Sequence, residues 1–212
     1  MAKLEKDWDK PLSEPVGLKI KDSMFPGPPL KQRINQIIHR LNIQSSRLNV
    51  LLERLREKDK RLFERVIDSY LKHDVDRAKV FANEVANTRK TIRLVDGCKT
   101  ALESVALRLE TIQSIGDVAV TVSGAISVIQ SIRGKLGGIL PELDKELLAV
   151  NENLTGLLYE TEGPSGMIGG YNVTSEEAES ILREAMSVAE SRTKERLPEI
   201  PLGSNTTLTN KE

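Results

Sequence analysis

A seven-residue repeat of an arginine followed by a large aliphatic residue limits the fold of this chain more than any other feature. The repeat comprises Arg33 and Ile34, Arg40 and Leu41, Arg47 and Leu48, Arg54 and Leu55, and Arg61 and Leu62. Seven residues are close to two turns of an α-helix, so each set stays on nearly the same helix face. The aliphatic residues then form an apolar seam, and the arginines line its edge over roughly 42 Å. The repeat therefore predicts a long amphipathic helix.

The arginines of this repeat differ in their acidic neighbours. No acid occurs between residues 22 and 53, so the first three arginines have no carboxylate one helical turn away, and we expect them to bind an acidic partner. Arg54 and Arg61 have several glutamates within one turn, and we expect these two to be structural. The full set of candidate residues for binding a membrane or an acidic partner is Lys31, Arg33, Arg40, Arg47, Arg54, Lys58 and Arg61.

Composition favours helices packed through aliphatic side chains. Three Phe, one Trp and three Tyr among 212 residues are few for an ordinary compact core. The net charge is zero, but residues 30–66 carry ten basic and four acidic residues, whereas residues 141–200 carry five basic and thirteen acidic ones. The basic and acidic regions are therefore able to bind each other or separate partners.

Several kinds of chemistry lack the residues that they need. His39 and His73 have no clustered cysteines or carboxylates around them, so we expect no metal and no other cofactor. No nucleophile elbow, dinucleotide-binding motif or aromatic-rich basic sheet indicates an enzyme or nucleic-acid binding. Cys98 fits a reducing cytosol, residues 1–20 contain no secretory signal, and the longest uncharged run, residues 118–132, is too short to span a bilayer. We expect a cytoplasmic protein that is not an enzyme.

Helical periodicity resumes after a short turn. Asp74 is a suitable N-cap for a second helix, whose apolar pattern runs from Val75 to about Ile132 and would span roughly 85 Å if unbroken. Three glycines are the points at which this helix would bend or end: Gly97, Gly116 and Gly124. Two long helices joined by a short turn predict an antiparallel hairpin. We expect it to pack through Ile34, Leu41, Leu48, Leu55, Leu62, Phe81 and Val85.

Shorter elements follow a glycine-rich break at residues 134–138. An acidic helix begins with Pro141 in its first turn and runs to about Tyr159. Thr174 and Glu177 form a capping box for a last helix, which ends near Arg196. The expected all-α fold is thus divided into a flexible arm (1–29), a helical core (30–160), a glycine-rich linker (161–173), an acidic helix (174–196) and an extended tail (197–212).

One stretch carries a resemblance to a known family. Residues 78–90 read AKVFANEVANTRK, in which an alanine, an aromatic residue and an Ala-Asn-Glu step precede a basic turn. This stretch resembles the second-helix signature of the ESCRT-III (Snf7-like) family. The resemblance extends over residues 30–160 as an order of elements, namely a basic first helix, a long second helix, a glycine break and an acidic later helix.

A second similarity lies in the tail, where residues 197–201 read LPEIP. The segment is similar to the type-2 MIT-interacting motif, in which an extended Leu-Pro-x-aliphatic-Pro peptide lies in a groove between helices of an MIT domain. Prolines lower the entropy cost of holding such a peptide extended, and the aliphatic side chains serve as anchors. The residues that this similarity implicates are Leu197, Pro198, Ile200 and Pro201.

Together these features make the chain look like an archaeal cell-division (CdvB-type) member of the ESCRT-III family. The resemblance implies a cytosolic protein that polymerises with itself and with paralogous subunits on the inner face of the cell membrane at the division site, and constricts it. It also implies extraction by a Vps4-like AAA ATPase through its MIT domain. On this hypothesis the arginine edge faces anionic lipid, where each basic residue contributes about 1 kcal/mol.

Alternatives to parts of this hypothesis stay open in the sequence. The arginines are also able to contact acidic helices of the same or a neighbouring chain, with residues 141–196 folded back on the hairpin until polymerisation releases them. The chain would otherwise be a soluble coiled-coil adaptor or scaffold that does not bind lipid. In the arm, Leu4 and Trp8 are a candidate membrane anchor, because Trp favours the bilayer interface.

Overall fold

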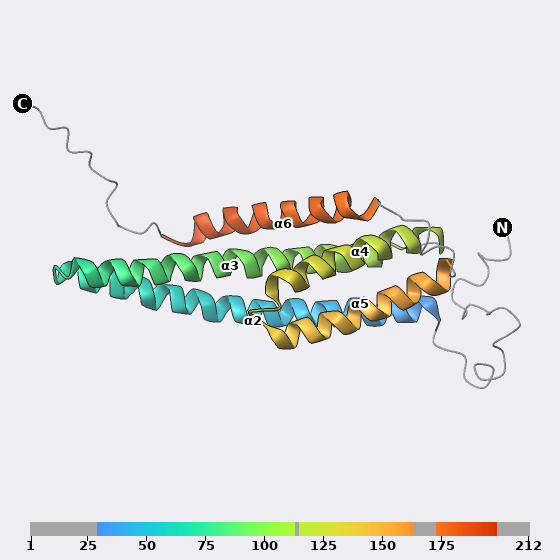
Figure 1. The fold of residues 1–212 in the computed structure, drawn as a ribbon, viewed down its shortest axis with the longest axis horizontal. Helices are drawn as coiled ribbons and strands as arrows, with labels where there is room; N and C mark the ends of the chain where they lie inside the picture. The colour runs from blue at the N-terminus through green and yellow to red at the C-terminus, as the bar shows by residue number, and fades with distance from the viewer. Residues whose placement is uncertain (1–28, 113–114, 163–172, 199–212) are drawn as a thin grey trace, which may run out of the picture.

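The computed structural model describes residues 29–112, 115–162 and 173–198 of the chain. Within these ranges the chain forms five α-helices and no strand, so the predicted all-α fold is confirmed. The helices are α2 (Leu30–Leu71), α3 (Val75–Glu110), α4 (Ile115–Leu136), α5 (Pro141–Glu162) and α6 (Val173–Arg196). They form an elongated bundle in which α2 and α3 make a long antiparallel hairpin (Figure 1).

The hairpin reverses in a short turn between α2 and α3. His73 in this turn has a φ of 57°, a left-handed conformation that His adopts more readily than most non-glycine residues. Asp74 caps α3 as predicted, because its carboxylate accepts a hydrogen bond from the backbone N–H of Arg77 at 3.1 Å. The predicted helical hairpin is therefore confirmed.

The apolar seam of α2 packs against α3 and forms most of the hairpin core. Among the predicted packing residues, Ile34, Leu41, Leu48 and Val85 are buried, and Leu55, Leu62 and Phe81 are half-buried. Residues of all five helices form the main core. A smaller group near the turn, which we call the tip cluster, consists of Val66, Ala82 and Val85 with Leu62, Phe63 and Phe81 packed against them. The hairpin thus has two separate apolar regions along its length.

Cys98 is part of the main core and is 1% exposed. Burial raises the pKa of its thiol from 9.0 to about 11, although the charge of Lys135 lowers it in part. The thiol is therefore protonated at neutral pH and packs as a small apolar group.

The second helix does not run unbroken to residue 132. α3 ends at Glu110, and α4 runs back antiparallel to α3 (Figure 1). The last turn of α3 is closed by Thr111, whose backbone N–H donates to the carbonyl of Arg108 at 3.2 Å and whose hydroxyl donates to the same carbonyl at 2.8 Å. Of the three candidate glycines, only Gly116 lies near this break. The apolar pattern continues across the reversal because both helices face the same core.

The remaining helices follow the predicted order. α4 ends at Leu136 and α5 begins at Pro141, which confirms the glycine-rich break, and α5 extends to Glu162. α6 lies along α3 and α4 and ends at Arg196 as predicted. It begins one residue before Thr174, which therefore lies inside the helix and not at its N-cap.

Four segments lie outside the described ranges: residues 1–28, 113–114, 163–172 and 199–212. They contain most of the expected arm, linker and tail, so the division of the chain into those parts stays a prediction. None of the described helices is long and apolar enough to cross a membrane.

Candidate interaction surfaces

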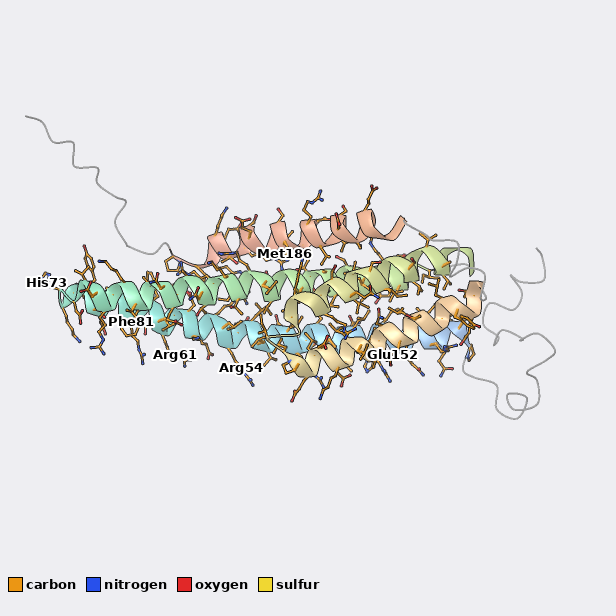
Figure 2. The ribbon with its side chains drawn as sticks, viewed as in Figure 1. Arg54, Arg61, His73, Phe81, Glu152 and Met186 are labelled. Carbon is orange, nitrogen blue, oxygen red and sulfur yellow. The ribbon has the colours of Figure 1, made fainter. Side chains whose placement is uncertain are left out.

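The arginine edge of α2 is partly paired and partly open to solvent. Arg33 forms an ion pair with Glu160 of α5, and Arg47 donates a hydrogen bond to the side chain of Gln44 at 3.3 Å. Figure 2 shows the side chains of Arg54 and Arg61 pointing away from the bundle. Four exposed residues of the candidate binding set make no hydrogen bond or ion pair within the described part of the chain: Arg40, Arg54, Lys58 and Arg61. Lys31 is also exposed on this helix.

The two ends of this edge differ in their partners. Arg33, which we expected to bind an acidic partner, pairs with Glu160 of α5, an acidic helix of the same chain, which is one of the alternatives that the sequence left open. Glu53 pairs with Arg56 at 2.5 Å and not with Arg54. Neither Arg54 nor Arg61 has an acidic partner among the described residues, although glutamates lie within one turn of each in the sequence.

Two exposed aliphatic residues lie between these arginines. Ile43 is 38% exposed and Val50 is 53% exposed, and they alternate with the arginines at the three- and four-residue spacing that keeps side chains on one helix face. We call this surface the arginine face; its members are Arg40, Ile43, Arg47, Val50, Arg54 and Arg61. The spacing is visible in the sequence, but only the structure shows that this second stripe stays outside the core. A face that combines guanidinium and aliphatic groups fits an anionic lipid interface or an acidic amphipathic helix.

α6 docks on the other side of the bundle through small and aliphatic side chains. Its buried apolar residues are Ala178, Ile181, Leu182, Ala185 and Ala189. Gly97 of α3 permits a close approach, since a Cβ atom added there would lie 2.3 Å from the sulfur of Met186. Near the end of α6, Arg192 lies 3.7 Å from the buried carboxylate of Asp96. α6 is therefore held mainly by apolar packing.

Gly97→Leu is expected to displace α6 from α3 while the hairpin stays folded. Overpacking of this kind costs about 1–3 kcal/mol, and leucine does not reduce the helix propensity of α3. Limited proteolysis should then cleave residues 173–196 faster than in the wild type. Gly134→Leu is the control, because a Cβ atom at Gly134 meets no atom of the described residues within 4 Å. Equal cleavage rates in the two variants would contradict the close packing of α6 at Gly97.

A buried ion pair joins the two helices of the hairpin. Arg89 of α3 donates from Nε to Asp59 Oδ1 at 3.0 Å and from Nη2 to Asp59 Oδ2 at 3.3 Å. Asp59 of α2 is 1% exposed, Arg89 is 9% exposed, and the guanidinium group lies 5.7 Å from the centre of the Phe63 ring. Two parallel hydrogen bonds of this kind make a bidentate arginine–carboxylate pair, which is stronger than a pair with a single hydrogen bond.

The sequence contained a signal for this pair that our prediction missed. Asp59 stands seven residues from both Leu52 and Val66, which are buried in the seam of α2. Arg89 likewise falls on the buried face of α3. A charged residue at a seam position requires a buried partner, because an unpaired charge there is strongly unfavourable. The sequence does not, however, show which residue of the other helix faces it.

The beginning of the predicted MIT-interacting motif lies against this pair. Arg89 donates a further hydrogen bond from Nη1 to the carbonyl oxygen of Pro198 at 2.5 Å. Leu197 is half-buried and packs against the main core. The other two motif residues, Ile200 and Pro201, and the candidate anchor residues Leu4 and Trp8 lie outside the described ranges. The first apolar anchor of the motif is thus held on the hairpin.

Comparison with known proteins gives two informative relatives. Cell division protein B1 of Sulfolobus acidocaldarius is 40% identical over 173 residues, which cover 82% of this chain and 81% of the relative. Cell division protein B of the same organism is 33% identical over 172 residues, which cover 81% of this chain and 66% of the relative, slightly less than two thirds of its length. No protein-family model matches the chain, and no solved structure matches it.

Proposed function

The chain belongs to the archaeal cell division protein B family, and from this premise we propose that it acts in cell division as a filament subunit on anionic membranes. Its filaments would constrict or sever the membrane, as the resemblance to ESCRT-III implies. The arginine face is the observation that carries this proposal. It offers exposed arginines without acidic partners in the described chain, interspersed with exposed aliphatic side chains, along one side of an elongated molecule.

The strength of this surface fits assembly better than binding by a single subunit. Each cation near an anionic membrane contributes about 1 kcal/mol to binding, so Arg40, Arg54 and Arg61 together contribute about 3 kcal/mol. This binding free energy is smaller than the roughly 4 kcal/mol that corresponds to a dissociation constant of ~1 mM. A filament that presents many such faces binds by avidity. Membrane binding and polymerisation should therefore depend on each other.

Charge reversal of the arginine face tests this proposal. The variant Arg40→Glu, Arg54→Glu, Arg61→Glu is expected to lose co-sedimentation with phosphatidylglycerol vesicles, and added salt should weaken wild-type binding because the Debye length is only about 10 Å at 0.1 M ionic strength. The control is Lys90→Glu, Lys145→Glu, Arg183→Glu, which makes the same change in net charge at exposed residues of α3, α5 and α6. Loss of binding in the control as well would mean that net charge, not this face, determines binding.

A soluble coiled-coil adaptor is the second candidate function. The observation in its favour is the three- and four-residue spacing of Ile43 and Val50 with the arginines, which also suits a partner helix with an acidic edge. An adaptor would not pellet with vesicles in either its wild-type or its charge-reversed form, and electron microscopy would show no filaments. A wild type that pellets and forms filaments excludes it.

We further propose that an MIT-domain AAA ATPase disassembles the filament through the tail motif. Leu197 packs against the core and the carbonyl of Pro198 accepts a hydrogen bond from Arg89, so the tail would have to leave the hairpin before an MIT domain binds all four motif residues. The same release would free α6 and expose the face of α3 that it covers. In this proposal the protein is cytoplasmic, lies on the inner face of the membrane at the division site, assembles with itself and paralogues, and has no catalytic activity.

A further inference from the structure

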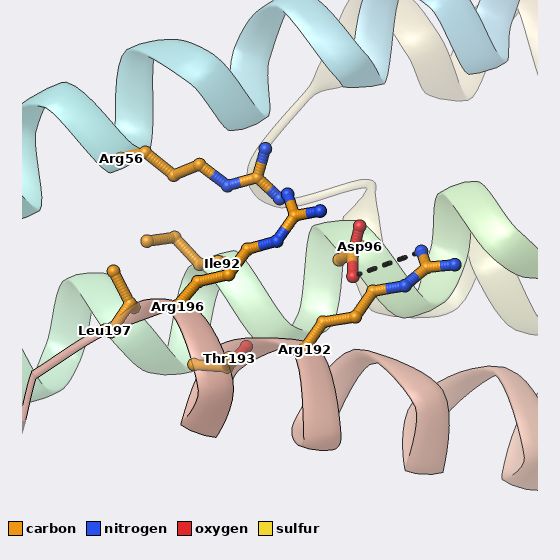
Figure 3. Close-up of a pocket in the computed structure, with 7 residues that line it drawn as sticks. All are labelled: Arg56, Ile92, Asp96, Arg192, Thr193, Arg196 and Leu197. Carbon is orange, nitrogen blue, oxygen red and sulfur yellow. Dashed lines mark ion pairs between the residues drawn. The ribbon is translucent and has the colours of Figure 1, made fainter.

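Three arginines meet where the last turn of α6 reaches the hairpin. Arg192 and Arg196 are four residues apart on α6, and Arg56 comes from the opposite helix α2. All three line one small pocket, whose remaining lining residues are Ile92, Asp96, Thr193 and Leu197 (Figure 3). The junction between α6 and the hairpin therefore concentrates positive charge from two separate elements.

The acidic groups at this junction neutralise the cluster only in part. Among the described residues, Asp96 is the one acid that lines the pocket, and its carboxylate lies 3.7 Å from Arg192. Arg56 pairs with Glu53 one turn earlier on its own helix. Arg196 has no hydrogen bond or ion pair within the part of the chain that the structure describes. Docking of α6 thus brings Arg196 toward Arg56 without an acid of the described ranges placed between them (Figure 3), and charge repulsion between the two arginines opposes docking.

We propose that this pocket binds a phosphate-type oxyanion between Arg56 on the hairpin and Arg192 and Arg196 on α6. Guanidinium groups match the geometry of phosphate oxygens and donate paired hydrogen bonds to them. The pocket volume is about 10 Å³, so the anion lies at the mouth, between the guanidinium ends. The Thr193 hydroxyl already donates to the carbonyl of Ala189 at 2.8 Å, which leaves recognition to the arginines.

The bound anion would act as a bridge between α6 and the hairpin. It replaces the repulsion between Arg56 and Arg196 with attraction to a shared negative charge, so anion binding and α6 docking stabilise each other. The ligand chemistry is that of a phosphate group, which either a free phosphate compound or a lipid headgroup supplies. The site is separate from the arginine face, because it lies between α2, α3 and α6 and uses none of the members of that face.

Titration of the full-length protein with inorganic phosphate at constant ionic strength tests the site. Calorimetry should detect binding to the wild type, and Arg56→Gln and Arg196→Gln should each weaken it by roughly tenfold, the loss expected for one hydrogen bond to a charged group. Arg183→Gln is the control, because Arg183 is an exposed arginine of α6 that does not line the pocket. Phosphate should also slow proteolysis of α6 in the wild type and in the control.

The charge-swap variant Arg196→Glu gives a second and opposite readout. Its carboxylate supplies the negative charge next to Arg56, so α6 should resist proteolysis without phosphate, and added phosphate should change nothing. Vesicles of phosphatidic acid, compared with free phosphate, identify the source: protection of α6 by vesicles alone indicates a headgroup, and protection by free phosphate indicates a solute. Equal phosphate binding in all variants, or no binding and no protection in the wild type by either probe, would overturn the proposal.

Discussion

Asp59→Ala is expected to lower the free energy of unfolding by about 3–5 kcal/mol, because it leaves the charge of Arg89 buried without a counter-charge. The Asp59 carboxylate accepts two hydrogen bonds from Arg89, and the pair is almost fully buried between the helices of the hairpin. Urea unfolding followed by circular dichroism measures the loss as a lower denaturation midpoint with a similar slope.

Two further variants show whether the loss comes from the unpaired charge. Asp68→Ala removes an exposed acid from the same helix and should change stability by less than about 0.5 kcal/mol. The double variant Asp59→Leu, Arg89→Met removes both charges and should recover most of the stability, since an apolar pair of similar volume is often neutral or better in such a position. A double variant as unstable as Asp59→Ala would show that packing, and not the uncompensated charge, causes the loss.

Removal of residues 163–212 is expected to make the protein assemble at a lower concentration. α6 covers part of α3 and α4 with five buried apolar residues, and on the proposed function this cover opposes polymerisation. If docking of α6 contributes even about 1.4 kcal/mol against assembly, its loss lowers the protein concentration required roughly tenfold. Pelleting assays over a concentration series measure this shift, and electron microscopy shows whether the pellet contains filaments.

Matched truncations separate this effect from simple aggregation. Removal of residues 199–212 alone leaves α6 and its contacts in place, so assembly should resemble that of the full chain. Charge reversal of the arginine face within the longer truncation should abolish vesicle binding. Unchanged assembly and vesicle binding after removal of residues 163–212 would refute the idea that the folded-back α6 restrains the subunit. Amorphous pellets without filaments would refute the proposed polymer.

The sequence predicted those parts of the fold that depend on local patterns. The seam of α2, the cap at Asp74 and the break before Pro141 each follow from residues close together in the chain, and the structure confirms all three. Gly116 marked a possible break, but the reversal of direction after Glu110 was not predicted, because the apolar period continues across it: α3 and α4 both bury their pattern in one core. Helical periodicity reports which face is buried, and it does not report the direction of the next helix.

The interaction surfaces were less predictable because they depend on pairs that are distant in sequence. Arg33 and Glu160 are 127 residues apart, and Arg89 and Pro198 are 109 residues apart. Local spacing identified the arginine edge, but it did not identify the partner of Arg33, because Glu160 comes from α5. The three arginines near the end of α6 form a cluster only after the chain has folded back.

The ion pair between Asp59 and Arg89 also bears on how α2 and α3 are aligned. Apolar seams that repeat every seven residues tolerate a shift of one helix along the other by a heptad, because aliphatic side chains then meet other aliphatic side chains. The same shift would move Asp59 about 10 Å away from Arg89 along the helix axis and leave both charges buried without partners. Since the pair lies on the hairpin between the main core and the tip cluster, it selects a single register for the whole length of the rod.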